Sequence, residues 1–160
     1  VDPADVAFRT KRMKVPMSKN LLIVLAVFLS LSLMTSCDKE TVIPVQDVPS
    51  EIQGYVSMHF PADSIIRAVK EKGESELFEI TLSNGFKLEF NAHYEIIDID
   101  GNAKLPDSVI QSSILDYVSS NYSAYYIIGW EIQGDNQEVQ LNSGIVLVFT
   151  LSGDFLRIDD

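Results

Sequence analysis

The side chains that could take part in chemistry are one thiol, two imidazoles and a group of carboxylates near residue 100 of the 160-residue chain. Cys37 is the only cysteine, so no intramolecular disulfide can form. His59 and His93 are the only histidines, and neither has further ligands at the spacing that a zinc site requires. No Gly-x-Ser-x-Gly motif, which would mark a hydrolase nucleophile, occurs. The sequence therefore predicts no catalytic residues, no metal site, no cofactor and no enzymatic activity.

The carboxylates lie in segment 98–102, Asp-Ile-Asp-Gly-Asn, which has part of the pattern of a calcium-binding loop. An EF-hand loop needs a third oxygen ligand before its glycine and a glutamate further on. Both are missing at those positions, and Asp159-Asp160 repeats the pattern at the end of the sequence. We therefore interpret the segment as the end of a strand followed by a turn.

Cys37 follows a segment with the features of a secretory leader. Basic residues precede a 13-residue apolar run, 21–33, which is shorter than the roughly 20 residues of a membrane-spanning helix. The window Met34-Thr35-Ser36-Cys37 resembles the lipobox of bacterial lipoproteins, with Met34 at the place where leucine is usual. That resemblance implies cleavage before Cys37 and acylation of its thiol, which would attach the chain to a membrane. The alternatives are an uncleaved signal anchor and a free thiol in a cleaved, secreted protein.

The leader sets the organisation and the charge of the chain. We expect residues 1–36 to hold a non-native upstream piece and the signal peptide, and residues 37–42 to form a tether. Five of the 12 Lys and Arg residues precede Cys37, but only two of the 23 Asp and Glu residues do. The net charge of −11 therefore becomes −14 for the remainder. Such an acidic surface repels phosphate backbones, which argues against nucleic-acid binding.

Two copies of one unit follow the tether, at residues 43–101 and 105–160. One constant spacing along the sequence pairs apolar and proline positions between the copies, as in Tyr55-Val56 and Tyr117-Val118. A slightly shorter constant spacing pairs segment 79–85, Glu-Ile-Thr-Leu-Ser-Asn-Gly, with segment 138–144. Because both blocks keep their order, the second copy differs mainly by a three-residue deletion between them.

Each copy is expected to form one helix followed by about four antiparallel strands. Helical spacing predicts helices within 49–60 and 110–122, the second with Asp107 or Ser108 as its cap. The predicted fold class is α+β: two tandem units form a continuous sheet of about eight strands with both helices on one face. Alternating residues and turn signals predict strands at 65–70, 78–82, 86–90, 96–100, 127–132 and 155–158, and in the segments equivalent to 78–82 and 86–90 of the second copy.

The doubled pattern resembles the PepSY-like domains, which are related in shape to beta-lactamase inhibitory protein. The shared features are Leu-Pro, a Tyr-Val helix, Glu-Ile-Thr-Leu-Ser-Asn-Gly, Leu-Glu-Phe and Ile-Asp, and they cover nearly all of residues 43–160. The resemblance implies an exported lipoprotein of a Gram-negative bacterium. We expect its lipid to anchor it to the outer membrane, although sorting to the inner membrane is the alternative. The resemblance also implies a non-catalytic binding or inhibitory module that uses its open sheet face.

The second copy departs from the first where it could meet a partner. Val146 and Val148 replace the polar Lys87 and Glu89, so the alternation predicts an apolar stripe on the open face. Tyr125 and Ile127 could share that face, with Ile128, Trp130 and Ile132 inward, although a shift of one residue would reverse this. We therefore expect Tyr125, Ile127, Val146 and Val148 to contact an envelope protein or peptide. The alternatives are a central strand covered on both faces and, for the whole chain, a structural or cation-binding lipoprotein.

Overall fold

The structure is a computed structural model that describes residues 39–72 and 77–159. The expected signal peptide, the upstream piece and Cys37 lie outside the described residues. Residues 38–160 form one compact unit. Within the described ranges, no helix is long and apolar enough to cross a membrane.

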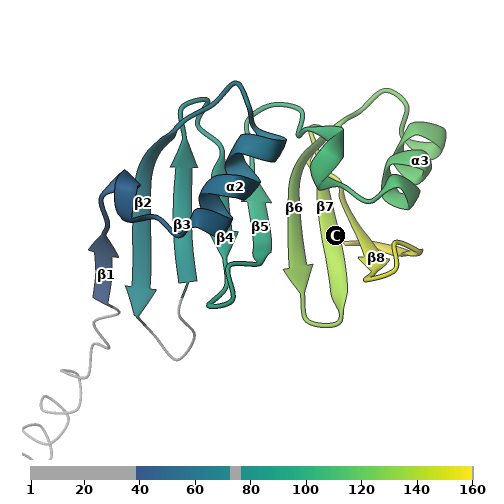
Figure 1. The fold of residues 1–160 in the computed structure, drawn as a ribbon. Helices are drawn as coiled ribbons and strands as arrows, with labels where there is room; N and C mark the ends of the chain where they lie inside the picture. Colours follow the sequence, from purple (N-terminus) through teal and green to yellow (C-terminus); the bar gives the residue numbers. More distant parts are fainter. Residues whose placement is uncertain (1–38, 73–76, 160) are drawn as a thin grey trace, which may run out of the picture. The chain divides into compact units, whose positions relative to one another are not determined.

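The unit is built on one antiparallel sheet of nine strands, in which every strand pairs with its neighbours in the sequence (Figure 1). The prediction of a continuous antiparallel sheet is confirmed, but its strand number is wrong by one. The extra strand is β1, which forms within the expected tether and pairs with β2 through Val42 and Val69. The strands are β1 Lys39–Val42, β2 Ile65–Lys72, β3 Leu77–Leu82, β4 Lys87–Phe90, β5 Ile96–Asp100, β6 Ile127–Gln133, β7 Asn136–Leu141, β8 Val146–Thr150 and β9 Phe155–Asp159.

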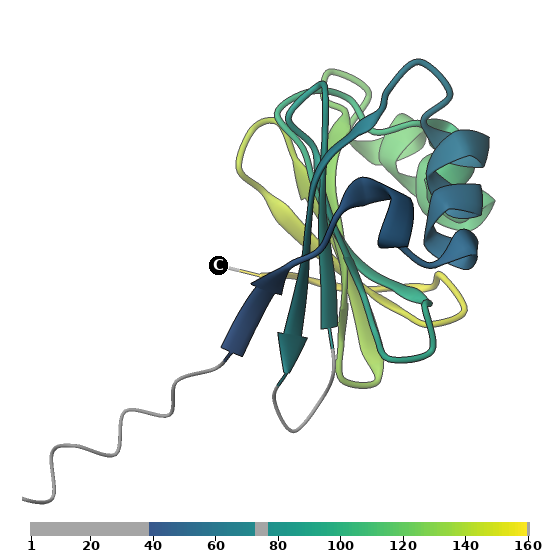
Figure 2. The same cartoon turned by 60° about the vertical axis from the view of Figure 1, so that its left-hand side comes forward.

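Both helices lie on the same face of the sheet, as Figure 2 shows from the side. Helix α2 spans Ser50–His59 and helix α3 spans Ser112–Asn121, and a short 3-10 helix precedes each, η2 at Val45–Asp47 and η3 at Asp107–Val109. The expected cap at Asp107 or Ser108 is wrong, because those residues belong to η3 and Gln111 is the N-cap of α3. The helices bury apolar pairs one turn apart, Ile52 with Val56 and Ile114 with Val118.

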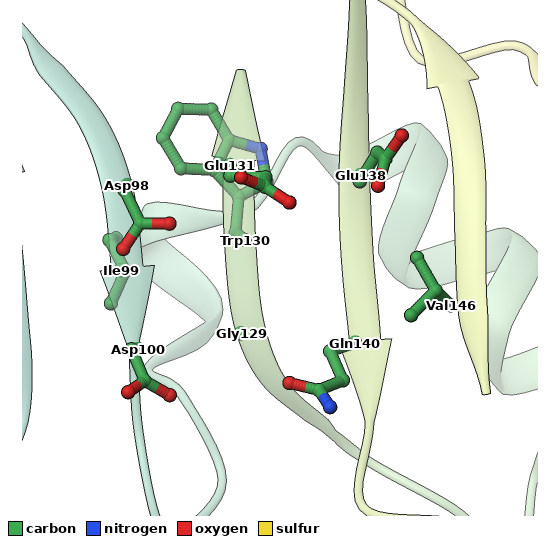
Figure 3. A pocket seen from close by; sticks show the side chains of 9 residues that line it. All are labelled: Asp98, Ile99, Asp100, Gly129, Trp130, Glu131, Glu138, Gln140 and Val146. Atoms are coloured by element: carbon green, nitrogen blue, oxygen red, sulfur yellow. The ribbon is translucent and has the colours of Figure 1, made fainter. Parts of the chain in front are cut away.

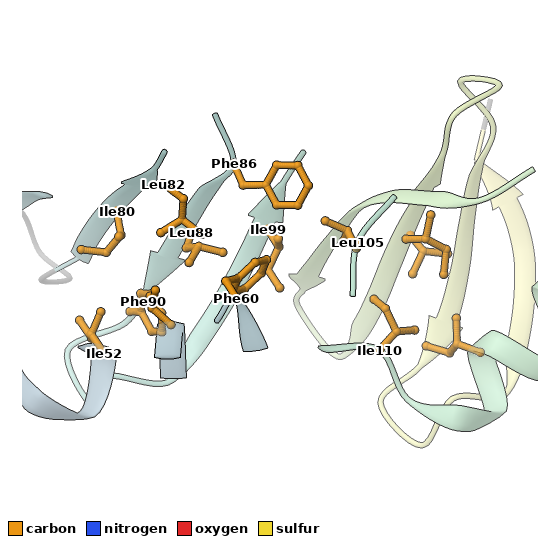
Figure 4. Close-up of a cluster of buried hydrophobic side chains, with 14 of the residues drawn as sticks. Ile52, Phe60, Ile80, Leu82, Phe86, Leu88, Phe90, Ile99, Leu105 and Ile110 are labelled. Carbon is orange, nitrogen blue, oxygen red and sulfur yellow. The ribbon is translucent and has the colours of Figure 1, made fainter. Parts of the chain in front are cut away.

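A single core cluster lies between the helices and the sheet and contains residues of both repeats. In Figure 4, Ile52 of α2 lies among Ile80, Leu88 and Phe90, which alternate along their strands with more exposed residues. The opposite face of the sheet has no helix across it within the described ranges, so side chains there depend on one another for cover. We call this surface the open face.

The turns repeat between the two copies with the same hydrogen bonds. In the first, the amide of Gly85 donates to the carbonyl of Leu82, and in the second that of Gly144 donates to Leu141. Both glycines have φ near +90°, which residues with a Cβ adopt only under strain. The predicted hairpin turn at 83–85 is therefore confirmed, and its counterpart in the second repeat has the same backbone form.

Candidate binding surface on the open sheet face

A row of five carboxylates crosses the middle of the open face. The strand register places Glu79 opposite Glu89, Glu89 opposite Asp98, Asp98 opposite Glu131, and Glu131 opposite Glu138. Residues directly opposite in an antiparallel sheet point to the same face, with their Cβ atoms about 5 Å apart. Like charges at that distance repel, so the arrangement costs stability in the free protein. We call these five residues the acidic row.

The acidic row spans the junction between the two repeats, which lies between β5 and β6. The first repeat supplies Glu79, Glu89 and Asp98, and their counterparts in the second repeat are Glu138, Val148 and Arg157. The negative charge therefore does not follow the repeat. It accumulates on β3 to β7 and ends at β8, where Val148 occupies the register position next to Glu138.

An arginine lies at each end of this row. At one end, Nη1 of Arg67 lies 2.8 Å from Oε1 of Glu79. Beyond the other end, Nη1 of Arg157 lies 2.8 Å from Oδ1 of Asp159, so this guanidinium is shared with a carboxylate outside the row. Both pairs are substantially exposed, and exposed pairs contribute little to stability. These arginines therefore offset little of the repulsion at the centre of the row.

A depression of about 330 Å³ opens beside the acidic row, across β5, β6 and β7. Its floor is Gly129, which lies opposite Asp100 and Gln140 in the register and has no side chain to fill the surface. Figure 3 shows the carboxylates of Asp98 and Asp100 on one side of Gly129 and the amide of Gln140 on the other. Glu131, Glu138 and Val146, which are half-buried, also line the depression. The depression thus combines several anionic oxygens with an apolar edge.

The pKa values of three of these carboxylates, Glu89, Asp98 and Glu138, are raised. Burial is the main reason that the pKa of Asp98 rises to about 6, and the charges of Glu89, Glu131 and Asp100 add to the effect. The pKa of Glu89 is raised by burial and by neighbouring glutamates, against an opposing effect of Lys87. Burial also raises the pKa of Glu138, with contributions from Asp159 and Glu131. In each case the ionised form is disfavoured, which is the condition that a bound cation would relieve.

The structure divides the four residues that the sequence grouped as a partner-binding stripe. Val146 and Val148 do lie on the open face, but Val148 is 0 % exposed and offers no surface. Ile127 is 4 % exposed and belongs to the core cluster, so its expected place on the open face is wrong. Tyr125 is exposed and lies before β6, away from the two valines in the register. Only Val146 borders the acidic depression.

A bulge in β6 explains the wrong face for Ile127. The pairing with β7 shifts between Ile127 and Gly129, so Ile127 and Trp130 both face the core although an odd number of steps separates them. The inward position of Trp130 is confirmed, whereas Ile132 is 37 % exposed near the end of the strand. The carbonyl of Ile128 accepts a hydrogen bond from Gly101 in the connection between the repeats, which holds the bulge in place.

Tyr125 and Ile127 instead line a second cavity of about 280 Å³ between α3, β6 and the connection that precedes η3. Its inner wall is apolar, with Leu105, Ile110 and Val118 from the core. An exposed ion pair, Nζ of Lys104 with Oδ1 of Asp107 at 2.8 Å, lies at its rim. This cavity is on the helix side and is separate from the acidic row.

The other residues considered for chemistry have structural surroundings. Nδ1 of His59 lies 3.0 Å from Oγ of Ser108, and its ring packs against Tyr55. His93 lies in the exposed turn between β4 and β5, where Oδ1 of Asn91 accepts a hydrogen bond from its backbone amide. Asp98 and Asp100 end β5, as the sequence predicts. In the described part of the chain, no three His, Cys, Asp or Glu side chains are arranged to hold a metal ion.

The doubled helix-and-strand unit with one uncovered sheet face defines a two-repeat α+β module. A family model described as beta-lactamase-inhibitor-like, PepSY-like matches residues 33–98 and again residues 99–157. The chain therefore belongs to the PepSY-like family, and the two matched segments confirm the tandem repeat.

Solved structures show the same fold. A candidate periplasmic protein of unknown function from Bacteroides vulgatus is 25 % identical, with a TM-score of 0.72 over 76 % of this chain and 100 % of that chain. A candidate calcium-regulated periplasmic protein from Bacteroides thetaiotaomicron is 25 % identical, with a TM-score of 0.71 over 76 % and 97 %. A third, also from Bacteroides vulgatus, is 24 % identical with a TM-score of 0.72 over 78 % and 100 %. No protein with a curated description matches the chain.

Two of these structures are described as periplasmic proteins, which supports export of this chain to the cell envelope. About three quarters of this chain covers nearly all of each similar structure, so the described unit corresponds to almost the whole of each of them.

Proposed function

We propose that the chain is a non-catalytic binding module of the bacterial cell envelope, which recognises a cationic segment of an envelope protein or peptide on its open sheet face. The observation that carries this proposal is the acidic row, five carboxylates in register across five strands. The repulsion among these carboxylates, together with the burial that raises the pKa values of Glu89, Asp98 and Glu138, disfavours their ionised form, and a cationic partner would relieve it.

The dimensions of the row favour an extended segment over a small ion. Neighbouring strands lie about 4.8 Å apart, so five strands span roughly 19 Å, the length of about six residues of extended chain. Alternate residues of such a segment point to the same side, so Lys or Arg at every second position would face the carboxylates. The depression at Gly129 leaves room for one of these side chains, with Val146 beside its apolar stem.

A divalent cation is the second candidate ligand. It is favoured by the same cluster of carboxylates and by the description of one similar structure as a candidate calcium-regulated protein. Calcium takes about six to eight oxygen ligands at roughly 2.3–2.6 Å. The described carboxylates are spread along a row and form no group arranged for a metal ion, so a basic segment fits them better.

Membrane attachment belongs to the same proposal. Cys37 would carry the lipid, and the module would be held on the outer membrane with its sheet exposed to envelope proteins. Expression of the full chain in a Gram-negative bacterium should give a protein that begins at Cys37 and carries acyl chains. Intact-mass measurement of the detergent-extracted protein checks this, with Cys37→Ser as the control that should retain its leader. An unmodified thiol on the matured chain would contradict the attachment.

Binding of a basic peptide tests the proposed site. Residues 38–160 should bind a fluorescent hexapeptide of alternating Lys and Thr, measured by anisotropy at low ionic strength. Neutralising the centre of the row with Glu89→Gln, Asp98→Asn and Glu131→Gln should weaken binding by at least roughly tenfold, because three attractions are lost together. Binding should also strengthen as pH rises through about 6, where Asp98 ionises.

A matched triple variant separates the row from the net charge of the protein. Its substitutions are Asp47→Asn, Glu51→Gln and Asp116→Asn, which also remove three negative charges, but from exposed positions on the helical elements. These changes should leave peptide affinity within about twofold, because the charges lie outside the row. Equal losses in the two triple variants would show that only overall charge matters and would remove the proposed site. Calcium titration by calorimetry tests the second candidate on the same proteins.

A further inference from the structure

The last strand of each repeat has a different neighbour, although the two strands are equivalent. Strand β9 is the counterpart of β5 in the second repeat, and the same turn precedes both strands. In the first turn the amide of Asn91 donates to the carbonyl of Glu95, and in the second the amide of Thr150 donates to the carbonyl of Asp154. The outer edge of β5 pairs with β6. The outer edge of β9 has no paired strand among residues 39–72 and 77–159.

This difference leaves apolar side chains uncovered on β9. Ile99 of β5 is 1 % exposed, because it lies opposite Trp130 of the next strand. Its counterpart Ile158 is 48 % exposed, and Leu156 in the same strand is 49 % exposed. An edge strand with apolar side chains and free backbone groups is a template for pairing with another strand. In the first repeat the equivalent edge, that of β5, pairs with the antiparallel strand β6. An antiparallel strand is therefore the kind of neighbour that we expect at the edge of β9.

The charged residues of β9 are arranged so that two antiparallel copies of the strand would have opposite charges facing each other. Arg157 and Asp159 lie on the open face, where they pair with Val148 and Val146 of β8. The equivalent of Arg157 in the first repeat is Asp98, so a basic residue has replaced an acidic one at the uncovered edge. A strand that reads Arg-Ile-Asp can meet an antiparallel copy of itself with Arg opposite Asp on both sides of the centre.

We propose that β9 pairs with β9 of a second copy of this chain, antiparallel and with Ile158 at the two-fold axis. Residues that lie opposite each other in the two β9 strands must point to the same face of the sheet. The two-fold axis therefore has to pass between two copies of the same residue. Centring on Ile158 places each Arg157 opposite the Asp159 of the second copy and brings the two Ile158 side chains together. Centring on Arg157 or on Asp159 would instead oppose like charges, which is unfavourable.

The two-fold arrangement also closes the assembly. Pairing of β9 with β1 of another copy would leave a new β9 edge free at each step and produce an open fibre. Pairing of β9 with itself uses both free β9 edges at once. Because the axis is perpendicular to the sheet, the open faces of the two copies lie on the same side, so their two acidic rows face the same partner.

Charge reversal on one strand tests the pairing. Residues 38–160, which lack Cys37 and cannot form a disulfide, should be dimeric by sedimentation velocity and dissociate on dilution. Arg157→Asp alone and Asp159→Arg alone should each weaken self-association by about tenfold or more, because both symmetry-related pairs become repulsive. An equimolar mixture of the two variants should dimerise again, since one is acidic at both positions and the other basic at both.

The mixture also shows that both variants are folded. Lys104→Asp, which changes the charge equally at an exposed site outside β9, should leave dimerisation unchanged. A wild-type chain that stays monomeric at its highest soluble concentration would overturn the proposal. Single variants that dimerise like wild type, a mixture that stays monomeric, or fibres that grow with concentration would each overturn it as well, the last in favour of pairing between β9 and β1.

Discussion

Replacing Gln137 with alanine is expected to destabilise the protein by about 3 kcal/mol, because it removes the only polar side chain buried in the described core. Gln137 takes the position that Phe78 holds in the first repeat. It is 1 % exposed, and Nε1 of Trp130 donates to its Oε1 at 2.8 Å. Its Nε2 donates to the carbonyl of Thr150 at 2.9 Å and to Oε1 of Gln111 at 3.3 Å, so both of its N–H groups have partners.

The cost has two parts, which a second variant separates. Alanine leaves a cavity and also removes the hydrogen bonds that Gln137 makes with the indole of Trp130 and the carbonyl of Thr150. Gln137→Leu keeps most of the volume and should cost about 2 kcal/mol through the lost hydrogen bonds alone. Urea unfolding measures both. Gln140→Ala, on the exposed side of the same strand, should change stability by less than about 0.5 kcal/mol. Equal costs for Gln137→Ala and Gln140→Ala would refute the role of the network.

Gly153→Ala is expected to cost about 3 kcal/mol for a different reason, a backbone that requires glycine beside a crowded helix end. Gly153 has φ +88° in the turn before β9, and a Cβ there would collide with Oγ of Ser113 and lie 2.7 Å from Oε1 of Gln111. Gln111 cannot move freely, because its Nε2 donates to the carbonyl of Leu151 at 3.0 Å. The side chains of Ser113 and Gln111, or the turn itself, would therefore have to move.

Gly144 provides the matched control for that substitution. Its φ is +89°, but no atom lies within 4 Å of the place where its Cβ would be. Gly144→Ala should therefore cost only the backbone strain, about 1 kcal/mol. Thermal or urea unfolding of the two variants compares them directly. If both lose the same stability, the contact with α3 contributes nothing and the argument from crowding is wrong.

The repeat comparison shows how one turn tolerates two residue types. The position of Gly153 is occupied in the first repeat by Tyr94, which has φ +63° and is the only described non-glycine residue with positive φ. Its ring packs edge-on against Phe78 with centroids 5.4 Å apart, and this contact offsets part of the strain. In the second repeat Gln137 replaces Phe78, the aromatic contact is lost, and glycine takes the strained position.

Much of the fold could be predicted because its local patterns are repeated. Alternation over segments such as 78–82 and 86–90 identifies strands, and Gly85 marks a turn that both repeats share. Strand β1 was missed because its short segment, Lys-Glu-Thr-Val, carries no alternating apolar pattern. Only the pairing with β2 makes it a strand, and that pairing is not encoded within the segment.

The site was harder to predict than the fold, because it depends on register between distant strands. Glu89, Asp98 and Glu131 are visible in the sequence as ordinary surface charges on alternating strands. Glu89 and Asp98 meet through the pairing of β4 with β5. Glu131 joins them only through the pairing of β5 with β6, across the long connection 101–126 that includes η3 and α3. The expected place of Ile127 in the apolar stripe is wrong for a related reason, since the bulge at Ile128 turns Ile127 to the core face. A bulge also occurs at the start of β2, the equivalent strand of the first repeat.

The pairing between β5 and β6, which joins the two repeats, is short, so we expect it to be the least stable strand pairing within the sheet. It has three register pairs, Asp98 with Glu131, Ile99 with Trp130 and Asp100 with Gly129, and one of these sets two carboxylates against each other. Local opening is therefore expected to begin at this joint, while each half keeps its own helix and hairpins. A positively charged ligand that contacts carboxylates of both repeats would stabilise the pairing of β5 with β6. Binding of such a ligand would therefore reduce local opening between the two repeats.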